Sequence, residues 1–289
     1  MVTAGSRSLP IRLVTFNIRY ATKNPGPGEE PWSVRCPRLC AQLKFITSGH
    51  DSAFVCLQEV LYSQLADIIA HLGTSWGYIS QGREDGKLAG EHSPILFRLD
   101  RWVCKRSSTF WLSPTPDVPS KGWDADLERI VTMGSFRHRE IGVVVVLMNT
   151  HFDHRGEVAR EESARLLLKL AGTWPGEGAS AASPPVFLGG DFNSTPTGRA
   201  YKVLTEPGSG IRDISSLVPD EAKYGNLEMT FTSFGNANIP PARIDFLFVR
   251  TTGVECLRFS TFGILTNRFD DGVYISDHRP VVADVEVPF

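Results

Sequence analysis

The chain has 289 residues, of which 42% are hydrophobic, and a formal net charge of −2 at pH 7. This length allows a large core in one big domain or two small ones. The near-neutral net charge does not favour a nucleic-acid binder, although it does not exclude a local basic cleft. No apolar run is long enough for a transmembrane helix, and no signal-peptide core precedes the first predicted strand. Five scattered cysteines favour a reducing compartment, so we expect an intracellular protein, cytoplasmic or nuclear.

The first predicted element is a strand at 11–20, which is rich in β-branched and aromatic residues. A turn-rich loop follows at 24–31, and Ser33 is a candidate cap for a helix over 35–46. A second strand at 53–60 precedes a helix at 62–72, whose apolar residues have helical spacing.

The second half of the chain alternates further strands with two helices. Predicted strands lie at 78–80, 93–99, 108–113, 129–138, 141–152, 186–190, 229–233, 243–250, 256–264 and 280–287. Helices are predicted at 157–172 and 198–204. This pattern predicts two packed β-sheets with helices outside, as one domain over 11–289 after an N-terminal tail at 1–10.

Polar side chains recur at the ends of the predicted strands. They are Asn17, Glu59, His151, Asp191 and Asn193 at strand ends, Asp245 early in a strand, and Asp277 and His278 just before the last strand. If these strand ends converge, they form an acidic pocket that needs a cation. Carboxylate and amide oxygens without thiolates suit a hard divalent ion, Mg²⁺ or Mn²⁺. Any one of these residues alone would be read as a turn residue or a cap.

The same residues stand in six ordered motifs that resemble those of the endonuclease/exonuclease/phosphatase superfamily. The motifs are "TFNIR", "LQEV", "NTHFDH", "GGDFNSTP", "RIDFLF" and "SDHRPV". The resemblance runs from about Ile11 to Val287 and points to a small stand-alone branch of this DNase I-like superfamily. It implies a four-layered α/β-sandwich of two packed, mostly antiparallel β-sheets flanked by helices.

The resemblance also implies roles for the metal ligands and the base. Glu59 resembles the main metal-ligating glutamate, and Asn17 and Asp277 resemble its neighbours around the ion. Asp191 is similar to the carboxylate that orients and deprotonates the attacking water. Asn193 lies two residues further on, on the same side of an extended chain, where its amide can contact the substrate phosphate.

Two histidines resemble the family's catalytic imidazoles. His278 is similar to the histidine that contacts the scissile phosphate, and Asp245 would hold its ring in one tautomer. His151 resembles a second catalytic histidine, with Glu91 at the place of its carboxylate partner. Because a carboxylate raises the pKa of a neighbouring histidine, we expect a His151 ring that can be cationic near neutral pH.

Substrate-facing residues are less defined by the motifs. Arg129 resembles an arginine that touches phosphate in the DNases, and Arg155 and Lys121 are further cationic candidates. Trp111 and Trp123 are candidates for stacking on a base or for packing in the core.

The leading hypothesis is a Mg²⁺- or Mn²⁺-dependent phosphodiesterase that acts, as a monomer, on nucleic acid, with DNA as the expected substrate. The alternative is a phosphatase or phosphodiesterase for a small phosphate ester, a nucleotide or a phospholipid headgroup. A non-catalytic binding module is disfavoured, because such domains usually lose part of the acid–base and metal set. The active-site tyrosine of the abasic-site nucleases has no counterpart in "GEHSPIL".

Overall fold

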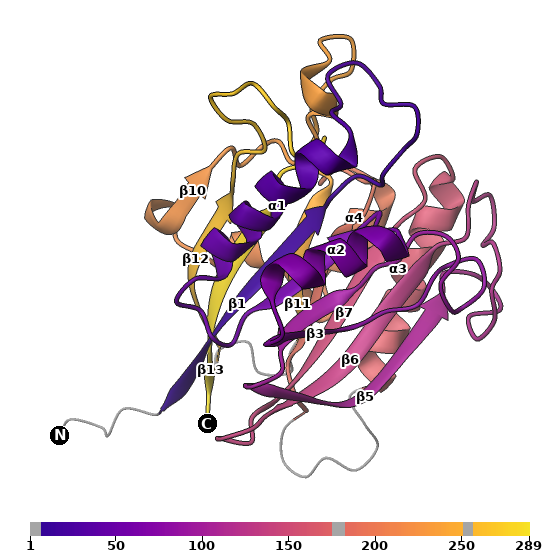
Figure 1. The fold of residues 1–289 in the computed structure, drawn as a ribbon. Coiled ribbons are helices and arrows are strands. Elements are labelled where there is room, and N and C mark those ends of the chain that lie inside the picture. The colour runs from indigo at the N-terminus through magenta and orange to yellow at the C-terminus, as the bar shows by residue number, and fades with distance from the viewer. Residues whose placement is uncertain (1–6, 175–182, 251–256) are drawn as a thin grey trace.

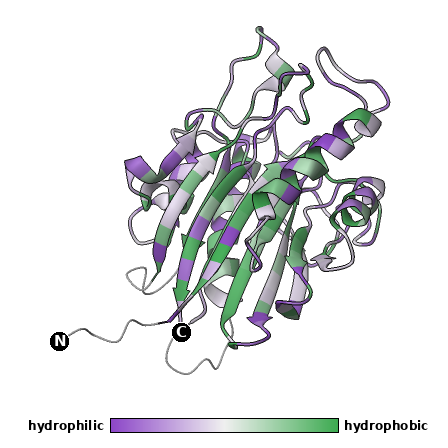
Figure 2. Ribbon diagram, turned by 60° about the vertical axis from the view of Figure 1, so that its left-hand side comes forward, coloured by the Kyte–Doolittle hydropathy of each residue, from purple (hydrophilic) through white to green (hydrophobic). Residues whose placement is uncertain are grey.

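Two β-sheets pack face to face at the centre of the structure, and helices cover their outer faces (Figure 1). The computed structural model describes residues 7–174, 183–250 and 257–289. Apolar residues follow the central strands of both sheets (Figure 2). The layers confirm the predicted α/β-sandwich.

The first sheet has seven strands. In spatial order they are β10 (Lys223–Gly225), β12 (Arg258–Ile264), β13 (Val281–Pro288), β1 (Ser8–Asn17), β2 (Phe54–Gln58), β4 (Ile95–Arg98) and β3 (Trp76–Ile79). Only the pairs β10/β12 and β1/β2 are parallel. β1 pairs with β13 from Ser8 onward, three residues before Ile11, where the sequence places the start of the domain.

The second sheet has six strands. In spatial order they are β5 (Trp102–Trp111), β6 (Ile130–His138), β7 (Val144–His151), β8 (Val186–Asp191), β11 (Asp245–Arg250) and β9 (Ile211–Asp213). Only β7 and β8 are parallel neighbours, so the pairing in both sheets is mostly antiparallel, as predicted.

In the described part of the chain, four α-helices form the outer layers. The first sheet is covered by α1 (Trp32–Thr47) and α2 (Tyr62–Leu72), and the second by α3 (Glu157–Thr173) and α4 (Arg199–Thr205). Three short 3₁₀ helices lie at η1 (Ile214–Ser216), η2 (Asp220–Ala222) and η3 (Ser233–Gly235). A third apolar cluster fills the space between the sheets, with Phe54 and Phe136 among its buried residues. None of the described helices has the length and apolar character of a membrane span.

Two local predictions are wrong. α1 begins at Trp32 after Pro31, so Ser33 lies inside the helix and does not cap it. The stretch at 229–233 forms only isolated bridges, from Phe231 to Ala242 and to His278, and no strand. Its backbone instead forms separate hydrogen bonds with the residues on either side of His278: Thr232 N–H donates to the Asp277 carbonyl at 2.7 Å, and the Thr230 carbonyl accepts from Arg279 N–H at 2.7 Å.

Strand pairing brings the polar strand ends to one edge of the sandwich. Parallel β1 and β2 end together, with Asn17 opposite Gln58 and Glu59 next in the chain. Parallel β7 and β8 end with His151 opposite Asp191, and antiparallel β11 begins with Asp245 opposite the same Asp191. The register of five strands therefore fixes where the site lies.

Candidate active site

A cavity of about 520 Å³ opens at this edge, between loops from both sheets. Eight of the side chains predicted from the sequence line it: Glu59, Glu91, Arg129, His151, Asp191, Asn193, Asp277 and His278. Asn17 and Asp245 lie beneath its floor and are hydrogen-bonded to residues that line it. Arg155 is the predicted site residue that neither lines the cavity nor lies beneath its floor. Its side chain is 71% exposed and pairs with Asp126.

Two of the three predicted metal ligands, Asn17 and Glu59, are in contact where β1 and β2 end, and the third, Asp277, lines the same cavity. Glu59 has a φ of 57°, a backbone conformation that turns the chain sharply after β2 and directs its carboxylate toward the cavity. Asn17 Nδ2 donates to Glu59 Oε1 at 3.1 Å and to Asp191 Oδ2 at 2.9 Å, so this one amide links the ends of both sheets.

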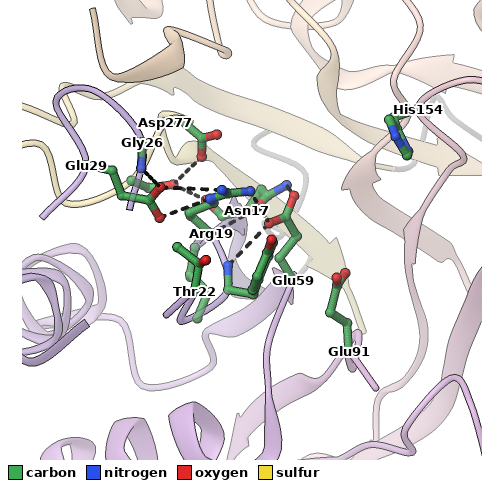
Figure 3. A network of polar contacts seen from close by, with 12 residues as sticks. Asn17, Arg19, Thr22, Gly26, Glu29, Glu59, Glu91, His154 and Asp277 are labelled. Atoms are coloured by element: carbon green, nitrogen blue, oxygen red, sulfur yellow. Dashed lines mark hydrogen bonds and ion pairs between the residues drawn. The ribbon is translucent and has the colours of Figure 1, made fainter. Parts of the chain in front are cut away.

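Arg19 is a cavity residue that the sequence did not single out. Its Nε donates to Glu29 Oε1 at 3.1 Å, and its Nη1 lies 3.7 Å from Glu59 Oε2 (Figure 3). Glu29 is buried and also accepts from the Gly26 backbone N–H at 3.0 Å. Glu29 therefore holds the Arg19 guanidinium beside the carboxylate of Glu59.

The residues present fit a hard divalent cation. Burial raises the pKa of Asp277, and the nearby charge of Glu59 adds to the rise. Two carboxylates that face one cavity in this way are stabilised by a cation between them, and their oxygens are ligands that Mg²⁺ and Mn²⁺ prefer. In the described part of the chain, Asp191, Asp245 and His278 also bring ligand atoms within 4.8 Å of one another. That second group fits a metal less well, because Asp245 and His278 are already hydrogen-bonded to each other.

Asp191 is the buried carboxylate at the centre of the site. Burial, together with the charge of Asp245 opposite, raises its pKa to about 7. Its Oδ1 accepts from the Asn193 backbone N–H at 2.9 Å, and Asn193 adopts a φ of 45° that folds the chain back over the strand end. A carboxylate with a pKa near neutrality is suited to take up a proton from a nucleophile.

His278 and Asp245 form a short buried pair. His278 Nδ1 lies 2.8 Å from Asp245 Oδ2, and its Nε2 is 3.7 Å from Asp191 Oδ2. Burial alone lowers the pKa of His278, but the charges of Asp245 and Asp191 outweigh it and raise the pKa well above its usual value. Asp245 and Asp191 therefore favour the cationic form of this imidazole, which lines the cavity.

His151 has a different environment from the one expected. Its Nδ1 is 4.0 Å from Glu91 Oε2, and Glu91 instead forms two hydrogen bonds with Arg83, at 2.8 and 3.0 Å. Burial, then the charges of Arg129 and Arg83, lower the pKa of His151 well below its usual value. The expected cationic ring is thus wrong, because burial and the two guanidinium charges disfavour a positive ring, and Arg83 already pairs with the carboxylate that was to raise the pKa.

Arg129 is held at the cavity wall by a buried aspartate. Its Nε donates to Asp153 Oδ2 at 3.4 Å, and its Nη2 lies 3.1 Å from His154 Nδ1. Asp153 Oδ1 also accepts from the backbone N–H groups of Arg155 and Gly156, just before α3. Asp153 therefore joins the start of α3 to Arg129.

Three other candidates lie away from the cavity. Trp111 is buried and its Nε1 donates to the Arg83 carbonyl at 2.6 Å, so it packs and does not stack on a base. Trp123 and Lys121 are exposed and do not line the cavity.

The Asp153 contacts predict an acid-dependent loss of stability. Despite the opposing effect of burial, hydrogen bonds from Gly156 and Arg155 and the charge of Arg129 lower the Asp153 pKa from 3.8 to about 2. A lowered pKa stabilises the fold above pH 4, and this contribution is lost as the pH falls from 4 to 2. Asp153→Asn should lower the free energy of unfolding by roughly 2 kcal/mol at pH 7. Urea unfolding at pH 7 and at low pH measures it; a difference from the wild type that persists near pH 2 would contradict this account.

Similarity to known proteins shows which family the chain belongs to. The family model described as the Endonuclease/Exonuclease/phosphatase family matches residues 14–278. A solved structure of a Bacteroides vulgatus protein with that family description is 34% identical, with a TM-score of 0.80 and coverage of 96% of this chain and 99% of that one. A Bacteroides thetaiotaomicron protein of the same description is 30% identical, with a TM-score of 0.83 and coverage of 98% and 100%.

A third solved structure carries a named activity. It is a mannosyl-6-phosphatase of Bacteroides thetaiotaomicron, 31% identical, with a TM-score of 0.82 and coverage of 95% of this chain and 99% of that one. The family match spans all of the strand-end residues from Asn17 to His278. The chain is therefore a member of the endonuclease/exonuclease/phosphatase family, whose enzymes hydrolyse phosphate esters.

Proposed function

We propose that the chain is a Mg²⁺- or Mn²⁺-dependent hydrolase of phosphate esters, and that its substrate is a small phosphorylated molecule such as a sugar phosphate. The observation that carries the proposal is the set of side chains that line one cavity of about 520 Å³. It combines an oxygen ligand set, a carboxylate whose pKa is about 7, a cationic imidazole and the guanidinium of Arg129. Phosphoryl transfer needs these parts: charge stabilisation, a base and a positioned phosphate.

The residues are assigned as follows. Glu59 and Asp277, with Asn17 beside them, would hold the ion, which when bound acts as a Lewis acid on a phosphoryl oxygen. Asp191 takes the proton of the attacking water. His278, held by Asp245, places positive charge next to the phosphoryl oxygens as they become more negative.

Two further side chains position the phosphate in this scheme. The Asn193 amide and the Arg129 guanidinium both line the cavity and supply N–H donors to phosphoryl oxygens. Asp153 holds Arg129 from behind, so the guanidinium is oriented before substrate binds.

A small substrate is favoured over nucleic acid for three reasons. The cavity volume falls in the range typical of small-molecule sites, roughly 300–1,000 Å³. Neither Arg155 nor Lys121, the further cationic candidates, lines the cavity, and the Arg155 guanidinium is paired with Asp126 at 3.4 Å. The 31% identical relative is a mannosyl-6-phosphatase, so a hexose phosphate is the first substrate to test.

A substrate panel with Mg²⁺ and with Mn²⁺ tests the proposal. It contains mannose 6-phosphate, glucose 6-phosphate, a nitrophenyl monoester and diester, single- and double-stranded DNA, RNA, an inositol phosphate and sphingomyelin. We expect the highest kcat/KM on a small ester and little change in KM between low and moderate salt. Faster hydrolysis of DNA, with affinity that falls steeply as salt rises, would instead support the nucleic-acid alternative.

A further inference from the structure

A second, very small cavity adjoins His151 on the side away from Asn193. Its volume is about 10 Å³, and His151, Glu91, Arg83 and Arg129 are among the residues that line it. The three nitrogen-bearing side chains are more than nine-tenths buried, with exposed fractions of 6% for His151, 7% for Arg83 and 4% for Arg129. A buried space of this kind needs hydrogen-bond partners for every polar atom that faces it.

Three buried nitrogen atoms on these side chains have no hydrogen-bond partner among residues 7–174, 183–250 and 257–289. They are His151 Nδ1, Arg83 Nε and Arg129 Nη1. Both arginine atoms are donors in every protonation state relevant to a protein. Whether His151 Nδ1 is a donor depends on the tautomer of the ring.

Asn193 determines that tautomer. Its Nδ2 donates to the Phe152 carbonyl at 3.0 Å, which fixes the orientation of the amide because a carbonyl oxygen accepts only from the NH₂ end. The same Nδ2 lies 3.1 Å from His151 Nε2. Asp191 Oδ2 is further from that Nε2, at 3.4 Å, and already accepts from Asn17 Nδ2 at 2.9 Å, so Asn193 is the hydrogen-bond partner of Nε2 and the proton of the neutral ring is on Nδ1. Burial and the two guanidinium charges, which lower the pKa of His151, also favour the neutral ring.

All three unsatisfied atoms are therefore N–H donors, and they belong to side chains that line the small cavity. Glu91 Oε2 is 4.0 Å from His151 Nδ1, beyond the roughly 2.7–3.2 Å of a direct hydrogen bond. A cavity of about 10 Å³ holds about one water molecule. The charges are already balanced, since Arg83 pairs with Glu91 and Arg129 with Asp153, so a neutral acceptor fits better than an anion.

We propose that this small cavity is a binding site for one ordered water molecule that links His151 to Glu91. The water accepts the Nδ1–H of His151, donates one proton to Glu91 Oε2, and accepts a further hydrogen bond from an arginine N–H. Arg83 is then a positioning residue, because its two hydrogen bonds at 2.8 and 3.0 Å fix the carboxylate that receives the water proton.

The consequence for catalysis rests on the proposed function, whereas the water site itself does not. A water-linked Glu91 keeps the proton of His151 on Nδ1, so the unprotonated Nε2 faces Asn193 and the reacting centre. His151 then orients the Asn193 amide toward the substrate phosphate and does not donate a proton to the leaving group.

Two measurements on the wild-type protein test the site without any assay of activity. An atomic-resolution crystal structure should show one water within hydrogen-bonding distance of both His151 Nδ1 and Glu91 Oε2. Nitrogen-15 NMR of histidine-labelled protein, with His151→Gln to assign the signal, should show His151 as the neutral Nδ1–H form at pH 7. A direct hydrogen bond between His151 and Glu91, an anion in the cavity, or the Nε2–H form would overturn the proposal.

Arg83→Gln tests the positioning role, with exposed Arg212→Gln as the matched control. We expect kcat to fall roughly 10- to 100-fold in R83Q with KM nearly unchanged, and no change in R212Q. The His151 signal of R83Q should move away from the wild-type position. An unaltered kcat and His151 signal in folded R83Q would overturn the role of Arg83, whereas a wild type that hydrolyses no phosphate ester would refute only the proposed function.

Discussion

Asp191→Asn is expected to lower kcat by roughly 10²–10⁴-fold, the range typical for loss of a general base. The asparagine side chain has nearly the same shape and can still accept the Asn193 backbone N–H, but it cannot take up the proton of the attacking water. Steady-state turnover of the best substrate from the panel, with metal at saturation, measures the effect.

The melting temperature of D191N distinguishes loss of the general base from loss of the folded structure. The raised pKa of Asp191 means that its carboxyl group destabilises the folded state as the pH rises from about 4 to about 7. Removing the charge offsets the loss of the hydrogen bond from Asn17 Nδ2 in D191N, so the melting temperature at pH 7 should change little. Asp284→Asn is the matched control, since Asp284 is a partly buried acid paired with Arg12 near the other end of β1. Turnover by D191N within about threefold of the wild type would contradict the assignment of the base.

Glu59→Gln should abolish metal binding at the site and reduce turnover by roughly 10³-fold or more, since a catalytic metal contributes several kcal/mol to the transition state. The amide keeps the volume of the carboxylate and can still accept from the Tyr20 backbone N–H, which in the wild type donates to Glu59 Oε2 at 3.2 Å. It loses the negative charge, which pairs with Arg19 and would attract the ion, and one acceptor oxygen, which receives the Asn17 Nδ2 hydrogen bond. Calorimetric titration with Mn²⁺, alongside turnover, measures both effects.

Chelation supplies the complementary experiment. A chelator should inactivate the wild type to the level of E59Q, and added Mg²⁺ or Mn²⁺ should restore activity to the wild type alone. Glu140→Gln, an exposed acid of the same type that pairs with Arg101, should behave as the wild type does. Full activity in the chelated wild type would exclude the metal-dependent reaction proposed here.

The strand-end pattern was the part of the site that the sequence could predict. Asn17, Glu59, His151 and Asp191 each follow an apolar strand, and parallel pairing of β1 with β2 and of β7 with β8 brings such ends to one edge. Local periodicity predicts the strand ends. Their convergence was a condition of the sequence argument, the residue roles came from the resemblance to the family, and the parallel pairing that brings the ends together is a finding of the structure. The periodicity of the strands and helices also explains why two packed sheets with helices outside could be predicted.

Contacts made by irregular loops could not be predicted in the same way. Arg83 and Glu91 lie eight residues apart in "GREDGKLAGEH", which has no periodicity, and they meet because the loop folds back with Arg83 N–H bonded to the Glu91 carbonyl. Glu29 lies in a turn-rich loop and reaches Arg19 only through the path of that loop. A charged residue in such a segment is most often solvated, so the sequence pattern carried no signal for either pair.

Environment also decided the charge of the histidines. His278 and His151 both stand near carboxylates, and the sequence predicted a cationic ring for His151 on that ground. The two pKa shifts are opposite. Burial and the charges of Arg129 and Arg83 lower the pKa of His151, and Glu91 is paired with Arg83, whereas direct contact with Asp245 outweighs burial at His278. Proximity in a motif does not reveal which cation a carboxylate pairs with.

A crystal structure of the wild-type protein with Mn²⁺ and orthophosphate tests the central claim most directly, because anomalous scattering locates the ion independently of the protein model. We predict an anomalous peak coordinated by Glu59 and Asp277, with phosphate oxygens in contact with His278 and Arg129. An ion bound elsewhere, or saturating Mn²⁺ and phosphate with the cavity still occupied by solvent alone, would contradict the account.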